Sequence, residues 1–478
     1  MIPMKRTRPV RGYLMLVAIV FGSIFVTVLG ALTGFVLTEN RAQSTATAAS
    51  RGLAIAEAGL EYYRWYLAHY PGDLQNGTGV AGPYTIPYND PEGGETGTIE
   101  LAITGNTSCE TLTSVDISST GTPAEDPLVS RTITTRYARP TVARYSYILN
   151  DSVWAGADRI ILGPYHSNGG IRMDGTINSP VTSSLSTWLC TSSFGCSPNQ
   201  TKEGVWGAGT NPDLWNYPVP QVDFGAISAD LASLKTKSVT AGRYLPRFSQ
   251  TNNTNAASYW HGYHLVFNAG GTVTVSRVTS APALSSTHIN PSDNSLPDRM
   301  LISNETFYST ITIPENCGLI FVEDNVWIEG VVDAKVTVVA ANVTTTGIEP
   351  NAMLRGNLTY AQTDGSDGLT LIAQNNVLIT PDSPFNMTLN GIFIAQGGAF
   401  GRNYYANATY DARGTLTILG TTVSNIRTGT KWCLNSSCTN SAGYQTRIDA
   451  YDRNLATDPP PFTPTTSTDY EFVDWREQ

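Results

Sequence analysis

The sequence predicts a mainly β protein with a long N-terminal α-helix, followed by a right-handed parallel β-helix (solenoid). An uncharged apolar run near the N-terminus continues into a helical pattern of small and apolar residues. Beyond it, short apolar runs bounded by Gly, Asn or Asp recur over residues 143–430. Charged residues make up only 14% of the chain and hydrophobic residues 41%, a content of hydrophobic side chains that excludes general disorder.

The N-terminal run has the length of a membrane span. The basic residues Lys5, Arg6, Arg8 and Arg11 precede Gly12, and residues 13–38 then carry no charge. At the rise of an α-helix these residues extend about 39 Å, enough to cross a hydrocarbon core of about 30 Å. The run exceeds the 7–15 residue apolar core of a cleavable secretory signal, so we expect a retained transmembrane helix over 13–38.

Charge asymmetry predicts the topology. Residues 1–38 carry a net charge of +4 and the whole chain −10, which leaves −14 on the remainder. The positive-inside tendency then keeps the N-terminus in the cytoplasm, with one pass through the membrane and the acidic bulk exported. An acidic exported mass argues against nucleic-acid binding, which requires basic patches.

The helical pattern continues as an amphipathic segment over 39–70. Its stripe has the spacing of a heptad repeat and comprises Ala42, Ala46, Ala49, Leu53, Ala56, Leu60, Tyr63 and Leu67. Pro71 and Gly72 then end the helix. The pattern alone also fits a membrane anchor with a short coiled coil.

Two segments of this helix resemble type IV pilus proteins. The junction at Gly12 and Tyr13 resembles the leader junction of type IV prepilins, and Ala56-Glu57-Ala58-Gly59-Leu60 is similar to the A-E-A-G-[LI] segment of PilX-like minor pilins. The resemblance implies a leader over 1–12 that the prepilin peptidase removes between Gly12 and Tyr13. It also implies that the helix binds other pilin subunits and the pilus assembly machinery.

One position departs from the pilin pattern. The fifth residue after the junction is Val17, where major pilins carry a Glu that can pair with the N-terminal amine of a neighbouring subunit. Val17 avoids burying a carboxylate but cannot form this pair. By resemblance, this points to a minor, initiating or tip subunit and away from a bulk filament former.

The region after the helix, residues 71–142, is expected to be a small β-rich, pilin-like subdomain. Ile99, Leu101 and Ile103 alternate with polar residues over 96–103, as in a half-buried strand. A second, weaker strand pattern covers 132–137.

A repeat supports the β-helix expected over 143–430. Residues 318–328 align, with one insertion, on residues 368–379, and the two segments start 50 residues apart. This offset equals about two turns of a coil with roughly 20–25 residues per turn. A pair of β-sandwiches is the competing fold, since its strands have similar spacing.

Four further segments resemble the large β-helical ectodomains of PilX-like proteins. They are residues 163–175, residues 219–224 with the following helix (Ile227, Leu231 and Leu234 on one face), residues 459–464 and residues 474–477.

Six cysteines suit an oxidising compartment. Cys190 with Cys196, and Cys433 with Cys438, are expected to form two local disulfides, four free thiols being the alternative. Residues 431–478 are accordingly expected to be a disulfide loop and a Pro-rich tail. Cys109 and Cys317 could also pair, but the sequence does not show it.

Few residues indicate catalysis. Ser167 and His166 suggest a nucleophile and its base. No third group is evident to orient the histidine, however, and a glycine-rich turn explains the motif. His261 and His264 could ligate a metal, but no third ligand is evident, so packing on neighbouring aromatic residues is preferred.

An acidic turn is the remaining candidate site. Residues 364–368, Asp-Gly-Ser-Asp-Gly, could bind calcium but lack the full EF-hand pattern, and a tight turn explains them. We therefore expect neither a metal nor a cofactor.

These features together predict a non-catalytic minor subunit of a type IV pilus. Such a subunit would prime or cap the pilus and display its large head at the cell surface, for adhesion to a glycan or protein. The alternative is a membrane-anchored β-helical carbohydrate-active enzyme, which would need carboxylates clustered on one face.

Overall fold

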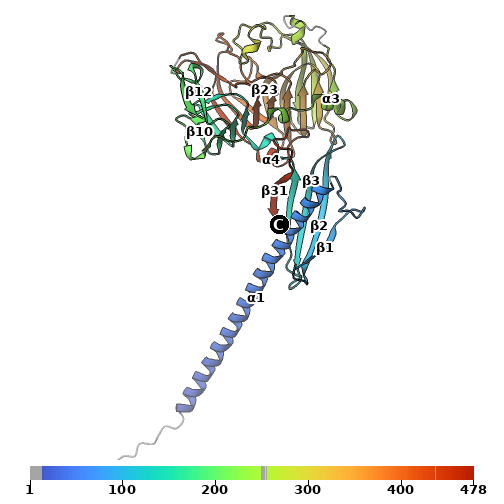
Figure 1. Cartoon of the computed structure of the whole chain (residues 1–478), viewed down its shortest axis with the longest axis vertical. Helices are drawn as coiled ribbons and strands as arrows, with labels where there is room; N and C mark the ends of the chain where they lie inside the picture. The colour runs from blue at the N-terminus through green and yellow to red at the C-terminus, as the bar shows by residue number, and fades with distance from the viewer. Residues whose placement is uncertain (1–12, 71, 249–252, 254–255, 436–437) are drawn as a thin grey trace, which may run out of the picture. The chain divides into compact units, whose positions relative to one another are not determined.

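The computed structural model describes residues 13–70, 72–248, 253, 256–435 and 438–478 (Figure 1). The chain is mainly β with a long N-terminal helix, as the sequence predicts. It divides into two compact units. Residues up to 104, 116–135 and 475–478 form the helix–sheet unit, and residues 105–115 and 136–474 form the head unit.

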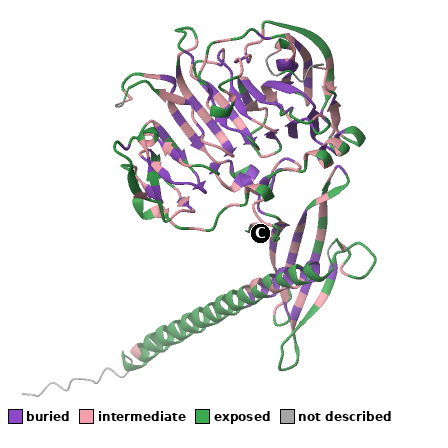
Figure 2. Ribbon diagram, turned by 45° about the horizontal axis from the view of Figure 1, so that its top comes forward, coloured by how far each residue is buried: buried purple, intermediate pink, exposed green. Residues whose placement is uncertain are grey.

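The N-terminal helix α1 (Tyr13–His69) is 57 residues long and ends one residue before the expected boundary. The expected leader, residues 1–12, lies outside the described residues. Figure 2 shows most of α1 exposed, and its buried residues begin only at Ala48.

A five-stranded sheet has the order β1 (Tyr84–Asn89), β2 (Glu95–Ser108), β3 (Thr111–Pro123), β4 (Arg131–Ala138) and β31 (Glu471–Glu477). The expected strands at 96–103 and 132–137 lie within β2 and β4. Ile99 and Leu101 are buried, as their alternation predicts. The last strand comes from the C-terminus, so the end of the chain is not only a loop and a tail.

Most strands of the head unit stack in parallel. The first stack runs through β16 (Arg243–Leu245), β20 (Leu319–Val322), β22 (Lys335–Ala340), β24 (Gly368–Ala373), the second half of β26 (Met387–Ala395), the second half of β28 (Ala412–Ser424), β5 (Tyr147–Leu149), β8 (Tyr165–Ser167), β11 (Val181–Ser183) and β15 (Trp215–Asn216).

Two further sets of strands are also parallel. One contains β17 (Gly262–Asn268), β21 (Asn325–Val332), β23 (Ala352–Tyr360), β25 (Val377–Ile379) and β27 (Phe400–Gly401), with β6 (Val153–Ala155), β9 (Ile171–Met173) and β14 (Val205–Trp206) paired separately. The other joins the end of β23 to the first halves of β26 and β28, then β30 (Ser441–Ala450), β7 (Arg159–Leu162) and β10 (Thr176–Ile177).

Antiparallel hairpins and short helices complete the head unit. The antiparallel strands are β18 (Thr272–Ser280) between β17 and β19 (Asn304–Thr312), β12 (Thr187–Cys190) with β13 (Gln200–Glu203), and β29 (Lys431–Cys433) with β30. The α-helices are α2 (Phe224–Ile227), α3 (Leu231–Thr240) and α4 (Arg453–Thr457). The 3-10 helices are Val142–Arg144, Ser192–Phe194, Pro212–Leu214, Ala257–Trp260 and Pro291–Asp293.

The strand order in space differs from the order in the chain. Residues 147–216 (the early block) precede residues 243–450 (the late block) in sequence, yet β28 and β30 of the late block pair with β5 and β7 of the early block. The chain therefore first forms a strand in the middle of the stack, β5, and continues to β15 at one end. It then passes through α2 and α3 to β16 at the opposite end of the stack. Figure 1 shows β10 and β12 at one end of the head unit and α3 at the other.

The internal repeat corresponds to two stacking steps. Leu319 pairs with Thr337, which pairs with Thr370, so one strand separates the two copies. The repeat aligns Asn325 with Asn376, and the structure adds Asn351 between them.

These buried asparagines form a ladder across successive strands. The amide of Asn351 donates to Oδ1 of Asn325 (2.9 Å) and that of Asn376 to Oδ1 of Asn351 (3.1 Å). Oδ1 of Asn376 accepts in turn from the amide of Ala399 (2.9 Å). The repeated asparagine thus satisfies backbone donors at the turns, a requirement for burying them.

The two blocks meet at a buried charge cluster. Asp449 accepts from Arg159 (2.6 Å) and Arg447 (2.7 Å), and all three are buried. Burial favours the neutral acid, but Arg447 and Arg159 outweigh it and hold the pKa of Asp449 below its ordinary value. Asp449 lies in β30, within the region expected to be a tail from residue 431. This part of the expected tail is instead a strand of the stack, because β30 pairs on both sides.

Candidate functional site

The first half of α1 is apolar and exposed. Among the described residues, α1 is the helix that is long and apolar enough to cross a membrane, and its most apolar stretch buries nothing in the chain. Tyr13, which begins the helix, is 70% exposed. An apolar surface of this extent requires a partner outside the chain.

The hydroxyl groups in this segment are satisfied within the helix. Thr27, Thr33 and Thr38 each donate to a carbonyl one turn earlier, at 2.8 Å. A polar group bonded in this way adds little cost in a hydrocarbon environment. The three threonines are therefore compatible with a membrane span.

The second half of α1 packs on the sheet of the same unit through glycines. A Cβ at Gly59 would lie 2.3 Å from Oγ of Ser119 and 2.6 Å from Cγ2 of Ile99. A Cβ at Gly121 of β3 would lie 2.1 Å from the carbonyl of Gly52. The helix backbone thus lies directly against β2 and β3.

This contact explains the segment that resembles minor pilins. Ala56, Gly59 and Leu60 are buried, while Glu57 is exposed. Small residues at these positions permit the close approach, and the exposed Glu57 keeps its charge in solvent.

The buried face differs from the heptad stripe that the sequence predicts. Ala42 and Ala46 are exposed, and Gly52 and Gly59 are buried in their place. The heptad stripe was assigned from apolar side chains. A helix whose backbone contacts a strand instead needs glycine at the contact, because a side chain there would collide with the strand. Two glycines seven residues apart in an Ala-rich helix were the available signal.

Asp73 fixes the chain where α1 ends. Its carboxylate accepts from the hydroxyl of Tyr66 (2.6 Å) and the amides of Gln75 (2.8 Å) and Gly77 (3.0 Å). The bond from Tyr66 is the main cause that lowers the pKa of Asp73, and it raises the pKa of Tyr66 to about 12. Tyr63 donates to the carbonyl of Asp73 (2.8 Å).

His166 and Ser167 do not form a nucleophile–base pair. The ring of His166 contacts Thr182 (2.9 Å) and Asn168 (3.0 Å), while Ser167 donates to the carbonyl of Asp151 (2.7 Å). Adjacent residues of a strand point to opposite faces, which separates the two side chains. Burial lowers the pKa of His166.

The glycines after His166 have a packing role. A Cβ at Gly170 would lie 2.0 Å from the ring of Trp188. Asn168 accepts from the amide of Val222 (2.9 Å) and donates to its carbonyl (2.8 Å). Two of the segments noted in the sequence, residues 163–175 and 219–224, are therefore in contact.

His264 lies in a line of charged groups on the late block. Its ring nitrogens contact Glu305 (2.8 Å) and Glu329 (2.9 Å), Glu329 accepts from Arg355 (2.7 Å), and Arg355 pairs with Asp382 (3.3 Å). The bond from His264 is the main cause that lowers the pKa of Glu329, and Arg355 adds to it.

The expected packing of His264 on aromatic neighbours is wrong. Tyr263 points into the core, and Trp260 packs with Tyr259. His261 stacks on Phe248 and forms no pair with His264. The partners of His264 are distant in sequence, so local spacing gave no signal for them.

The Asp-Gly-Ser-Asp-Gly segment is a turn closed by its own carboxylates. Asp364 accepts from the amide (3.0 Å) and hydroxyl (2.6 Å) of Ser366, and Asp367 accepts from the amide of Gln362 (2.6 Å). In the part of the chain that the structure describes, no three His, Cys, Asp or Glu side chains are placed to hold a metal ion.

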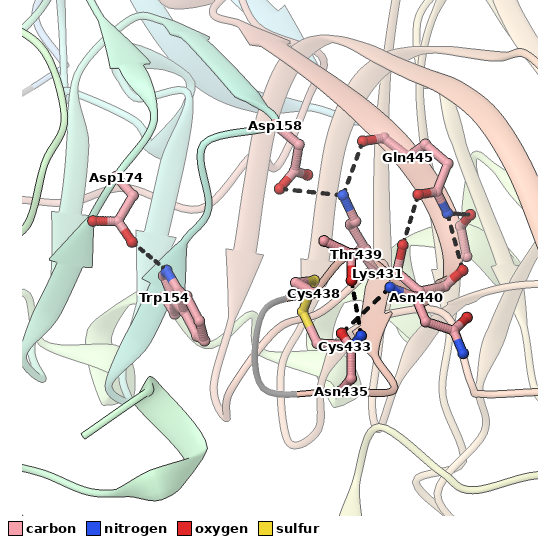
Figure 3. Close-up of a disulfide and its surroundings, with 12 residues drawn as sticks. Trp154, Asp158, Asp174, Lys431, Cys433, Asn435, Cys438, Thr439, Asn440 and Gln445 are labelled. Atoms are coloured by element: carbon pink, nitrogen blue, oxygen red, sulfur yellow. Dashed lines mark hydrogen bonds and ion pairs between the residues drawn. A yellow bond between two sulfur atoms is a disulfide. The ribbon is translucent and has the colours of Figure 1, made fainter. Parts of the chain in front are cut away.

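Three disulfides are present, linking Cys190 to Cys196, Cys433 to Cys438, and Cys109 to Cys317. Figure 3 shows Cys433 and Cys438 beside Asn435, whose side chain donates to Thr439 (2.8 Å). In the same view Lys431 pairs with Asp158 of the early block (3.7 Å). The link between Cys109 and Cys317 is the pair that the sequence left open.

No protein-family model and no curated protein matches the chain. Among solved structures, it is similar to the competence-associated pilin ComZ from Thermus thermophilus. The two share 12% identity over 90% of this chain and 98% of that chain, with a TM-score of 0.33. A likeness of this extent supports no conclusion about function.

Proposed function

We propose that this protein is a PilX-like minor subunit of a type IV pilus. The observation that carries the proposal is the division of α1 into an exposed apolar half and a half packed on the sheet of its own unit. The packed half supports the chain's own fold, and the exposed half is free to enter a membrane and then a bundle of subunit helices.

The route to the pilus follows from the N-terminal residues. Before assembly, the basic end lies in the cytoplasm, α1 spans the inner membrane, and the bulk of the chain is exported. The prepilin peptidase cuts between Gly12 and Tyr13, and α1 then joins other pilin subunits and the assembly machinery. With Val17 at the fifth position, the mature chain lacks the carboxylate that pairs with a neighbour, which favours a priming or capping role over repeated incorporation.

The head is displayed for adhesion to a surface glycan or protein. We propose that its parallel stacks close into a right-handed β-helix. The pairing of each strand with the next in register and the ladder at Asn325, Asn351 and Asn376 support this. A rigid coil of this kind can hold a binding face at a distance from the pilus. Its low content of charged residues is compatible with this role.

A catalytic head is the less favoured proposal. The carboxylates of Glu305, Glu329 and Asp382 belong to one chain of contacts, but each already contacts His264 or Arg355. Glycoside hydrolysis requires two carboxyl groups available to the substrate. A purified full chain without activity on a panel of polysaccharides is the expected result.

The mass of the mature N-terminus tests the pilus route. The full chain is expressed with an active prepilin peptidase, and its N-terminal peptide is identified by mass spectrometry. A chain that starts at Tyr13 is expected, and Gly12→Leu should block the cut. Membrane-bound protein that retains residues 1–12, in cells that process a control prepilin, would overturn the proposal.

A further inference from the structure

Two arginines are buried together in the late block without a carboxylate partner. Arg402 follows β27 and is 0% exposed, and Arg413 of β28 is 7% exposed. A buried charge normally has an opposite charge beside it, since its desolvation otherwise costs several kcal/mol. In the described part of the chain, neither side chain forms an ion pair.

Both guanidinium groups converge on the same backbone oxygen. The carbonyl of Pro381 accepts from Nη2 of Arg402 (3.3 Å) and from Nη2 of Arg413. Arg402 also donates to the carbonyl of Tyr410, and Arg413 to that of Ala412 (2.9 Å). Carbonyl groups satisfy these donors but do not neutralise two positive charges.

Three guanidinium nitrogens have no hydrogen-bond partner among the residues that the structure describes. They are Nε and Nη1 of Arg402 and Nε of Arg413. An N–H group buried without an acceptor costs about 1–3 kcal/mol, and more when it is charged. The site therefore lacks acceptor atoms for these three nitrogens.

The nearby carboxylates form no ion pair with Arg402 or Arg413, although the charge of Asp298 partly offsets the effect of burial on the pKa of Arg402. Asp298 accepts from Asn403 (2.9 Å) and Tyr405 (2.7 Å), and Asp382 pairs with Arg355 (3.3 Å). Burial lowers the pKa of Arg402 to about 10, and the charge of Arg413 contributes to the shift. Both effects are expected where like charges share a buried site.

We propose that Arg402 and Arg413 bind a small monovalent anion of the halide type, with chloride as the natural ligand. Such an anion places a negative charge in contact with both guanidinium groups and accepts from the unpartnered nitrogens. The burial of both side chains restricts the ligand to a small ion and excludes a phosphorylated or sulfated macromolecule. The anion would join the turn at Pro381 to β27 and β28 and so brace the late block.

Thermal unfolding of the full chain in detergent tests the site. The Tm is measured in chloride, bromide and gluconate at constant ionic strength. A ligand that binds only the folded state raises the Tm in a saturable way. We expect chloride and bromide to raise the Tm by about 2 °C or more over gluconate.

Two variants separate this site from general salt effects. Arg402→Gln should abolish the difference between halide and gluconate. Arg447→Gln is the matched control, because Arg447 is also buried but is paired with Asp449. It should lower the Tm in all three salts and retain the halide dependence.

A crystal structure of the unsubstituted chain soaked in bromide tests the site directly, and it does not depend on whether Arg402→Gln folds. An anomalous peak between the two guanidinium groups is the expected result. An ordered water at that position, with equal Tm values in the three salts, would overturn the proposal.

Discussion

The two halves of α1 belong to one unbroken helix but have different surroundings. Residues 13–47 include no buried residue, whereas the face that includes Gly52, Ala56 and Gly59 is buried on β2 and β3. The first half is rich in large apolar residues, and the second exposes charged residues such as Glu57 and Arg64.

The difference shows how one helix serves two environments. Large apolar side chains suit a hydrocarbon phase, where they need no specific partner. Small residues suit contact with a strand, where shape decides the packing. A substitution in the first half should therefore change membrane insertion and, under the proposed function, pilus assembly. A substitution in the second half should change the stability of the fold.

The largest effect is expected from Gly59→Val. The new side chain would collide with Ser119 and Ile99, and overpacking of this kind costs about 1–3 kcal/mol or more. The Tm should fall and limited proteolysis between α1 and β1 should accelerate. Gly34→Val is the control, because a Cβ at Gly34 meets nothing within 4 Å. Equal loss of Tm in both variants would contradict the division of α1.

Val26→Arg should reduce the insertion of α1 into the membrane and leave the fold unchanged. Val26 lies near the middle of the apolar run, where an arginine costs about 2.5–3.5 kcal/mol in membrane insertion. Cell fractionation should show less of the variant in the inner membrane. Ala54→Arg, at an exposed position of the second half, should fractionate normally. Unchanged insertion of both variants would argue against a span over 13–38.

Tyr66→Phe should reduce stability in a pH-dependent way. Because its folded-state pKa is lowered, Asp73 stabilises the fold above its ordinary pKa near 3.8, and this contribution is lost as the pH falls through the folded value. Without the bond from Tyr66, the Tm should be slightly lower at pH 7, and the difference should vanish as the pH falls through the folded-state pKa of Asp73.

Tyr62→Phe is the matched control for this pH dependence. Tyr62 bonds to the neutral side chain of Asn76 (3.1 Å), so its removal should lower the Tm equally across the pH range. A pH-independent effect of Tyr66→Phe would show that Asp73 is not the group involved.

The smallest effect on the fold is expected from Val17→Glu. Val17 lies in the half of α1 that supports no part of the chain's own fold, so the Tm should not change. Under the proposed function, the new carboxylate can pair with a neighbouring amine, and the variant should be more abundant in sheared pili. Val17→Ile should behave as the unsubstituted chain, and lower abundance of Val17→Glu would count against a pilin-type assembly.

Local patterns predicted the parts of the fold that depend on near neighbours in sequence. The run from Tyr13 and the stop at Pro71 located α1, and alternation at Ile99 and Leu101 located β2. The repeat between 318–328 and 368–379 revealed two stacking steps. Helical and strand periods arise from contacts within a few residues, so they are visible in a sequence.

Contacts between distant residues were not predicted. The pairing of Cys109 with Cys317, the partners of His264 and the meeting of the two blocks at Asp449 each join residues far apart in the chain. The early block comes first in sequence but completes the stack of the late block, and no local period records that order.

The sequence by itself determined that a long helix with an apolar first half precedes a β-rich, weakly charged body. Only the tertiary structure decided which face of α1 is buried. It also decided that Arg159 and Arg447 form ion pairs with Asp449, whereas Arg402 and Arg413 form none among the described residues. The reason is physical. Secondary structure follows from the spacing of side chains along the backbone, but close approach and charge pairing depend on which segments the fold brings together.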